Sequence, residues 1–142
     1  MTAKEYLSQT VVINHRIDSK LEQAVELRNL AMKVTISFGE DRVQSTKKQS
    51  PMEDIMVKLI DLEEEVNADI DELIRLKAEI LETISGVEDI NQQVILEKRY
   101  IAGKTWEDIA RETGYDRSTI YRNHGKALKE IEAIINNATL CD

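Results

Sequence analysis

Residues 106–125, WEDIARETGYDRSTIYRNHG, decide the fold of this 142-residue chain, because they match a helix-turn-helix at its most constrained positions. The fifth residue of that motif must be small, since the second helix crosses over it, and here it is Ala110. The ninth lies in the turn with a positive φ, which favours glycine, and here it is Gly114. The fifteenth must be apolar to fill the angle between the helices. Here it is Ile120, and Ile109 supplies the flanking core contact.

Both helices of the motif have a recognisable start. Thr105 precedes the first helix and has Asp108 three residues further on, a shorter-armed version of a capping box. Asp116 precedes the second helix and is a favourable N-cap residue. Helix-turn-helix units dock their second helix in the DNA major groove, so this segment predicts DNA binding. The alternative interpretation is an ordinary αα-corner that has no role in DNA binding.

The second helix of the motif has an apolar face and a polar face. Helical spacing directs Ile120, Ala127 and Leu128 into the core and leaves the polar residues opposite them. Arginine can bond a guanine edge and serine can serve several bases, whereas the amides that begin the preceding helix suit a phosphate. The predicted DNA-binding residues are Lys104, Thr105, Arg117, Ser118, Thr119, Tyr121, Arg122, Lys126 and Lys129. The alternative is a solvated polar face with no ligand.

The charge distribution favours the same helix. The chain carries a net charge of −8, which argues against a generally basic nucleic-acid-binding surface. Residues 115–129 nevertheless hold four basic residues against Asp116 alone, a local surplus of +3. Because local charge matters more than the total, this surplus indicates where DNA would bind.

Long helical patterns precede the motif. Apolar residues recur at helical spacing over 3–37 and again over 51–86. The polar segment 38–51 between them predicts an exposed, mobile loop. Two long helices joined by one loop form an antiparallel hairpin. The sequence therefore predicts an all-α protein with two domains, a helical hairpin over 1–87 and a helix-turn-helix domain over 88–142.

The second long helix carries an apolar stripe in steps of three and four, which is typical of a coiled coil. In a lone hairpin we expect this stripe to stay partly exposed at Ile55, Leu59, Leu62, Val66 and Ile70. Pairing two hairpins into a four-helix bundle buries such a stripe, so we predict a homodimer through the hairpin. The alternative is a monomer in which the C-terminal helices fold back over the stripe.

Enzyme and metal-site patterns are not found. The sequence contains no P-loop, no GxSxG and no convincing nucleophile–base pair, so we expect neither an enzyme nor a cofactor. His15 and His124 lack partners at metal-ligand spacing. The acidic run within 61–72 is interpreted as a solvated helix face and not as a magnesium site. Cys141 is the only cysteine, and no signal peptide or membrane-length apolar run is present, which predicts a cytoplasmic protein without a membrane partner.

Residues 94–129 resemble region 4 of bacterial sigma factors in the Arg-Tyr before the glycine, the TWEDIA opening and the HGKALK close. In that family the recognition helix reads the promoter −35 element. The resemblance implies that Arg117, Ser118, Tyr121 and Arg122 contact DNA. Ser118 and Tyr121 replace the family's usual glutamate and arginine, so major-groove docking is implied more strongly than −35 specificity.

The whole chain also resembles small phage and prophage proteins of Gram-positive bacteria, from MTAKEYL through MEDIMVKLIDLEEEVNADIDELIRLK. These proteins are grouped near the RinA and ArpU types of phage late-gene transcription regulators. The resemblance implies a phage regulator in the cytoplasm of a bacterial host that binds double-stranded DNA, with RNA polymerase as a further candidate partner. Two alternatives stay open, a small terminase subunit for DNA packaging and a protein–protein adaptor without DNA affinity.

Overall fold

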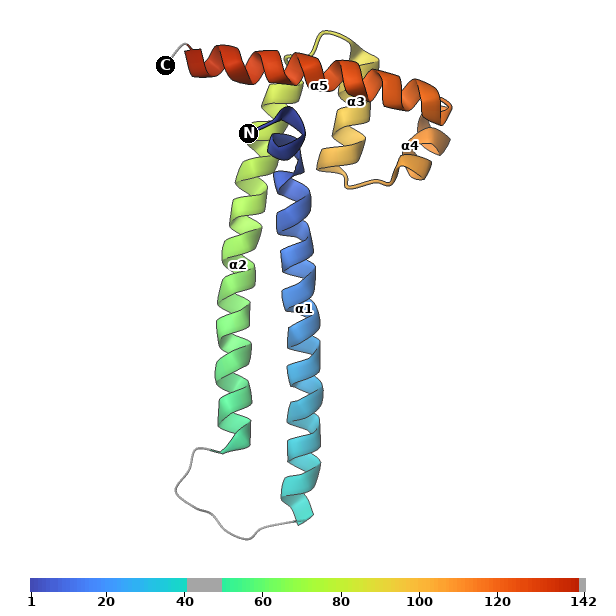
Figure 1. Ribbon diagram of the computed structural model, residues 1–142. Helices are drawn as coiled ribbons and strands as arrows, with labels where there is room; N and C mark the ends of the chain where they lie inside the picture. Colours follow the sequence, from blue (N-terminus) through green and yellow to red (C-terminus); the bar gives the residue numbers. More distant parts are fainter. Residues whose placement is uncertain (41–49, 141–142) are drawn as a thin grey trace. The chain divides into compact units, whose positions relative to one another are not determined.

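The computed structural model describes residues 1–40 and 50–140, and within these ranges the chain is helical and forms no strand (Figure 1). Proline begins one helix, and Asp or Thr caps precede others, as the sequence signals require. This confirms the predicted all-α fold class. The elements are α1 (Ala3–Glu40), α2 (Pro51–Ile84), α3 (Ile90–Leu96), the π-helix η1 (Glu97–Ile101), α4 (Trp106–Thr113) and α5 (Arg117–Leu140).

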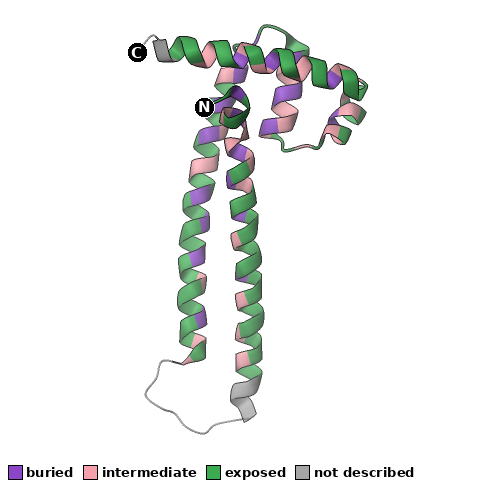
Figure 2. Cartoon of the chain, in the orientation of Figure 1, coloured by how far each residue is buried: buried purple, intermediate pink, exposed green. Residues whose placement is uncertain are grey.

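One of two compact units spans Asn14–Glu72 and contains an antiparallel hairpin of α1 and α2. Buried residues line the facing sides of the two helices as two stripes (Figure 2). The apolar members are Ile17 and Ala24 on α1, and Ile55, Leu62 and Val66 on α2. The hairpin predicted from the two helical patterns is therefore confirmed.

The apolar stripe of α2 is more deeply buried than we expected from the sequence. Ile55, Leu62 and Val66 are buried by α1 within the single chain, so the expectation that they stay partly exposed was wrong. The small side chain of Ala24 lies in the facing stripe, which lets the helices approach closely and cover the aliphatic residues. Leu59 is half-buried and Ile70 is exposed, in agreement with that expectation.

Asp69 occupies the inner face of α2 at the position where the sequence analysis placed Ile70. The steps of four and three that run through Leu62 and Val66 lead to residue 69, and so the geometry puts a carboxylate in the seam. Lys20 Nζ lies 2.8 Å from one carboxylate oxygen, and Arg16 Nη2 lies 3.3 Å from the other. The hydrogen bond from Lys20 lowers the pKa of Asp69. The interpretation of the acidic run as a solvated face was wrong at this residue.

The predicted loop over 38–51 is shorter in the structure. Helix α1 continues through Glu40, and α2 begins at Pro51 as expected. A single glycine, Gly39, costs a helix only about 1 kcal/mol, so it does not by itself end one. Residues 41–49, the rest of the predicted loop, lie outside the described residues.

The other compact unit combines Met1–Ile13 with Leu73–Asp142. Its larger core joins the first turns of α1 to the end of α2 and to η1 and α5. Two hydrogen bonds fix these segments to each other. Tyr6 Oη lies 3.0 Å from Thr83 Oγ1, and Thr10 Oγ1 donates to the carbonyl oxygen of Tyr100 over 2.6 Å. The fully buried aliphatic residues of this core are Leu7, Ile80, Ile84, Leu96 and Ile131.

Candidate nucleic-acid interface

The π-helix η1 leads into the motif. The amide of Ala102 donates to the carbonyl of Glu97, five residues back, over 2.9 Å. Gly103 then adopts φ +69, and the amide of Lys104 donates to the carbonyl of Lys98 over 2.9 Å. The glycine therefore ends this helical segment, whose last turn is wider than an α-helical one.

Helix α4 begins and ends at the predicted residues. The Thr105 hydroxyl accepts a hydrogen bond from the Asp108 amide over 3.1 Å, which is the N-cap half of a capping box. At the other end Gly114 adopts φ +78, and its amide donates to the carbonyl of Ala110 over 2.9 Å. A left-handed residue at this point reverses the chain within a short turn, which is the role expected of the glycine.

Helix α5 is capped by Asp116. One carboxylate oxygen of Asp116 accepts a hydrogen bond from the Thr119 amide over 2.8 Å. The same backbone hydrogen bond lowers the pKa of Asp116, because it stabilises the charged form. The start of the second helix was therefore predicted correctly, and Thr119 serves the cap with its backbone.

A small separate core sets the relation between α4 and α5. Ile95, Ile109 and Ile120 are completely buried against one another, and Trp106, Ala110 and Tyr115 pack around them. These three isoleucines come from α3, α4 and α5. Ile120 thus fills the angle between the helices, as predicted. The triad therefore holds α5 in a fixed orientation against α3 and α4. Replacing one of the three isoleucines by a smaller residue would open a cavity and loosen this packing.

The polar face of α5 is solvent-exposed over its first four turns. Thr119 is half-buried beside the cap, and the side chains of the other predicted α5 residues point away from the isoleucine core. The exposed members are Arg117, Ser118, Tyr121, Arg122, Lys126 and Lys129. Within the part of the chain that the structure describes, no ion pair engages Arg122, Lys126 or Lys129. These three cations are therefore available to an anionic ligand.

Two of the predicted contact residues already have carboxylate partners. Lys104 and Lys98 both bind Glu112 of α4, at 2.7 and 2.6 Å. The hydrogen bonds from Lys104 and then Lys98 lower the pKa of Glu112 to about 2. Arg117 Nη2 lies 2.9 Å from a carboxylate oxygen of Glu107. Helical periodicity does not predict these pairs, since their members are eight to fourteen residues apart and share no helix face.

Trp106 joins α4 to its neighbours through its ring. The guanidinium of Arg99 lies 4.4 Å from the Trp106 ring centroid, a cation–π contact, and Arg99 Nη1 donates to the Lys104 carbonyl over 3.0 Å. Tyr121 and His124 contact the same ring edge-on. Trp106 thus packs against the isoleucine core and these side chains. Arg99 was missed as a positioning residue, although its place directly before Tyr100 and the closing glycine was noted.

His124 is half-buried and bound within the protein. Its Nε2 lies 2.8 Å from Tyr100 Oη, and burial lowers the pKa of His124 to about 4. A neutral, bound imidazole is a poor phosphate ligand near neutral pH. His124 is therefore a partly buried polar residue that packs within the protein.

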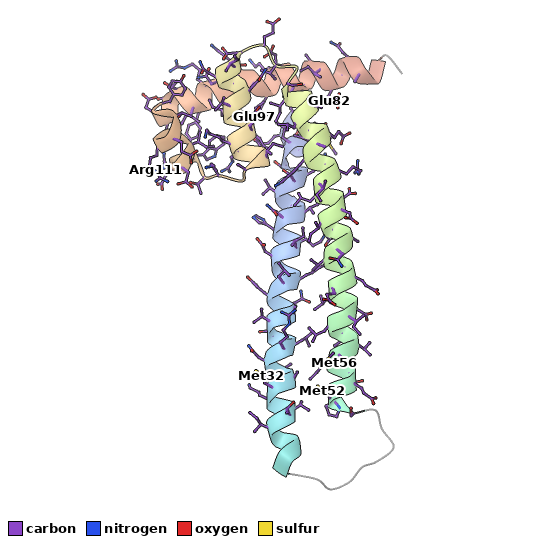
Figure 3. All side chains as sticks on the ribbon, turned by 180° about the vertical axis from the view of Figure 1, so that it is seen from behind. Met32, Met52, Met56, Glu82, Glu97 and Arg111 are labelled. Atoms are coloured by element: carbon purple, nitrogen blue, oxygen red, sulfur yellow. The ribbon has the colours of Figure 1, made fainter. Side chains whose placement is uncertain are left out.

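Other kinds of site find little support. Across residues 1–40 and 50–140, no three His, Cys, Asp or Glu side chains gather closely enough to hold a metal ion. The described helices include none with the length and apolar content needed to cross a membrane. The exposed face of α5, together with the start of α4, is the surface with the clearest chemistry. Arg111 of α4, labelled in Figure 3, forms an ion pair with Asp108 of the same helix.

Comparison with known proteins places this helical chain in a family. The model of the family described as "Protein of unknown function (DUF1492)" matches residues 33–132, and the chain belongs to that family. The matched span includes α2, α3, η1 and α4 entirely, together with parts of α1 and α5. No curated protein and no solved structure matched the chain.

Proposed function

We propose that this chain is a sequence-specific DNA-binding protein that inserts the first turns of α5 into the major groove. The observation that carries the proposal is the buried isoleucine triad of Ile95, Ile109 and Ile120, which holds a capped α5 against α4 with its polar face outward. Helix-turn-helix proteins present their recognition helix in this way. Arg122 supplies a donor fork for a guanine edge, and Ser118 an adaptable hydroxyl.

In this proposal, the basic side chains around the exposed face of α5 contact the DNA phosphates. Lys126 and Lys129 continue the exposed side of α5, and Lys104 stands at the start of α4 beside the Thr105 cap. Lys104 and Arg117 must exchange their carboxylate partners for DNA. Exposed ion pairs are worth only about 0–1 kcal/mol each, so this exchange is inexpensive. The remaining negative charge of the chain opposes unspecific binding, and so affinity for unrelated DNA is low and falls steeply with salt.

The proposed biological role is regulation of phage genes. It rests on the resemblance of residues 94–129 to sigma factor region 4 and of the whole chain to phage late-gene regulators. The DUF1492 family itself adds no activity to this argument. In this role the bound DNA is a promoter-proximal site, and RNA polymerase is a further partner.

The test is a selection of bound duplexes from a random-sequence library, followed by binding titrations at several salt concentrations. We expect a recurring sequence motif and a specific affinity that exceeds unspecific affinity by about 10³-fold or more. Enrichment of no motif, with no binding at low salt, would falsify the proposal and leave the protein–protein adaptor as the better account. A second selection, from fragments of a phage genome, tests the terminase alternative, which enrichment of a packaging site would support.

A further inference from the structure

The hairpin unit exposes a second apolar row that its own packing does not use. On α1, Leu21 and Val25 are 47% and 53% exposed, and on α2, Met56 and Ile60 are 47% and 51% exposed. The inner stripe is already filled by other residues of α1 and α2. An isolated exposed aliphatic residue needs no explanation, but four large ones in one place indicate a surface that binds a protein.

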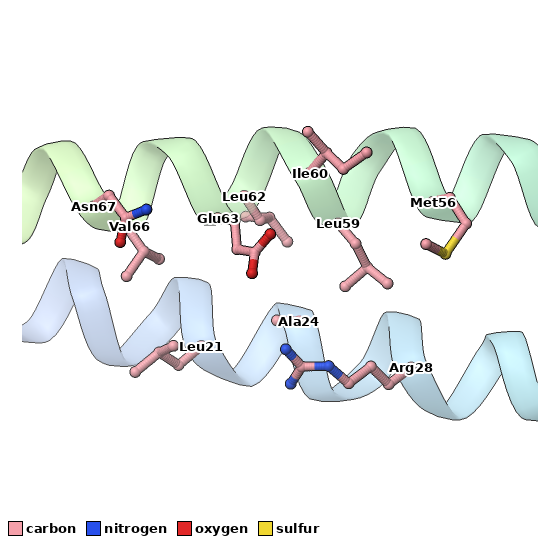
Figure 4. Close-up of a pocket in the computed structure, with 10 residues that line it drawn as sticks. All are labelled: Leu21, Ala24, Arg28, Met56, Leu59, Ile60, Leu62, Glu63, Val66 and Asn67. Carbon is pink, nitrogen blue, oxygen red and sulfur yellow. The ribbon is translucent and has the colours of Figure 1, made fainter.

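These four residues lie on one face. A groove of about 260 Å³ runs between the two helices, with Leu21 and Arg28 on one side and Met56, Ile60 and Glu63 on the other (Figure 4). Val25 follows Leu21 by four residues and precedes Arg28 by three, which puts it on the same side of α1. The row therefore has the steps of four and three of a coiled-coil seam on both helices.

The opposite face of the hairpin has a different character. Its groove is bordered by Glu26 of α1 and by Asp61 and Glu65 of α2, with Lys58 as the one cation among the lining residues. Leu27 and Leu30 supply its apolar floor. An acidic border suits contact with water, because charged residues are depleted in the centre of protein interfaces. Of these two described faces, the first has the composition of an interface core.

We propose that a second copy of this chain covers the face of Leu21, Val25, Arg28, Met56, Ile60 and Glu63. The two antiparallel hairpins then lie side by side, pointing the same way, and form a four-helix bundle. A two-fold axis along the helices packs α1 of each copy on α2 of the other. Arg28 then faces Glu63 of the partner subunit, twice by symmetry. Within the described residues neither Arg28 nor Glu63 takes part in an ion pair, so the face is self-complementary in charge as well as apolar.

The available area is sufficient for a dimer. The part of α1 from residue 14 to residue 36 is about 33 Å long at 1.5 Å per residue. Two packed helices are about 20 Å across, so each copy offers roughly 650 Å² and the pair roughly 1,300 Å². Specific interfaces bury about 1,200–2,000 Å² in total. The proposed dimer does not depend on DNA binding. It is tested by measuring the molecular mass of the protein in solution.

A matched pair of variants tests the face. Leu21 and Leu30 are both on α1 and both 47% exposed, and their separation of nine positions puts them on opposite sides of the helix. Mass is measured by light scattering and sedimentation on the full chain, with a reductant present. We expect a dimer for the wild type and for Leu30→Asp, and a monomer for Leu21→Asp. Circular dichroism should show equal helix content, since neither side chain belongs to the interior of the single chain.

Three outcomes overturn the proposal. They are a monomeric wild type at every attainable concentration, a Leu30→Asp variant that dissociates as readily as Leu21→Asp, and a wild type larger than a dimer. A charge swap tests the two-fold arrangement. Arg28→Glu and Glu63→Arg should each raise the dimer dissociation constant about tenfold, equivalent to 1.4 kcal/mol, and the double variant should recover most of this. Failure of the double variant to recover contradicts the parallel pairing.

Discussion

Tyr100 Oη and His124 Nε2 lie 2.8 Å apart, with the two rings stacked at a centroid distance of 5.8 Å. This contact joins the π-helix η1 to the first third of α5. Trp106 packs edge-on against the same imidazole, so α4 takes part as well. Two sets of contacts therefore hold α5 in place: the buried triad of Ile95, Ile109 and Ile120, and the aromatic cluster of Tyr100, Trp106 and His124.

The Tyr100–His124 contact predicts a pH-dependent stability. Burial lowers the pKa of His124 to about 4 in the folded protein, so between that value and its ordinary pKa the unfolded chain binds the extra proton. Stability is thus full above about pH 6.5 and falls as the pH drops towards about 4. Trp106 fluorescence during urea unfolding measures this, because Trp106 is the only tryptophan.

Replacement of His124 isolates the effect. His124→Gln keeps a hydrogen-bonding group beside Tyr100 but cannot titrate, so the midpoint of urea unfolding should change less between pH 6.5 and pH 4 than in the wild type. All other groups, His15 included, are common to both proteins and cancel in the difference. Equal pH dependence in the two proteins contradicts the assignment of a buried, neutral His124.

Two glycines make a second, paired prediction. Gly114 adopts φ +78, and a Cβ placed there would meet no atom within 4 Å, so any cost of Gly114→Ala is one of backbone conformation. That cost is about 1–2 kcal/mol. Gly125 also has open space around a Cβ but lies within helix α5, so Gly125→Ala should stabilise by about 0.5–1 kcal/mol. Urea unfolding should give opposite signs. The same sign for both would refute a left-handed requirement at the turn.

Much of the motif could be predicted from the sequence because its constraints are local. Thr105, Gly114 and Asp116 act on amides and dihedral angles within a few residues, so residue type and spacing suffice. Ile120 is recognisable because only one position can fill the angle between the helices. The exposed face of α5 then follows from helical periodicity.

The rest depended on contacts that periodicity does not encode. Asp69 lies in the seam because helix geometry places residue 69 there, whatever its polarity. A sequence pattern that assigns only apolar residues to the seam selects the neighbouring Ile70 instead. Its lysine partner, Lys20, is on another helix. The covering of Ile55 and Val66 by α1 likewise depends on how closely two helices approach. The pairs made by Glu107 and Glu112 require the packed geometry of α4.

Asp69 yields a third prediction. Asp69→Ala leaves Lys20, whose side chain is only 20% exposed, without its closest carboxylate at 2.8 Å. Lys20 then keeps a carboxylate partner only in the exposed Glu65, 4.0 Å away. A poorly paired cation in a seam is costly, so the midpoint of urea unfolding of the hairpin, followed by circular dichroism, should fall. Asp71→Ala removes the same charge from an exposed position of the same helix and should change the midpoint little. Similar losses in both variants would show that Asp69 has no special role.

Glu107 gives a fourth prediction, which concerns DNA. Glu107→Gln releases Arg117 from its carboxylate partner and frees one more cation for phosphate. The affinity for unspecific DNA should rise, and the slope of log affinity against log salt should steepen by about 1. Glu132→Gln, an exposed change of the same charge on α5, is the control. If both variants gained equally, net charge and not the release of Arg117 would be responsible.

The most direct test of the central claim is the binding of Arg122→Ala to a selected site and to a scrambled duplex. If Arg122 reads a base, the loss of its contact should cost about 1–3 kcal/mol on the selected site and much less on the scrambled one. Lys58→Ala, which removes one positive charge from α2, should weaken binding to both duplexes slightly and equally. An Arg122→Ala variant that lost the same affinity on both duplexes would contradict base reading by α5.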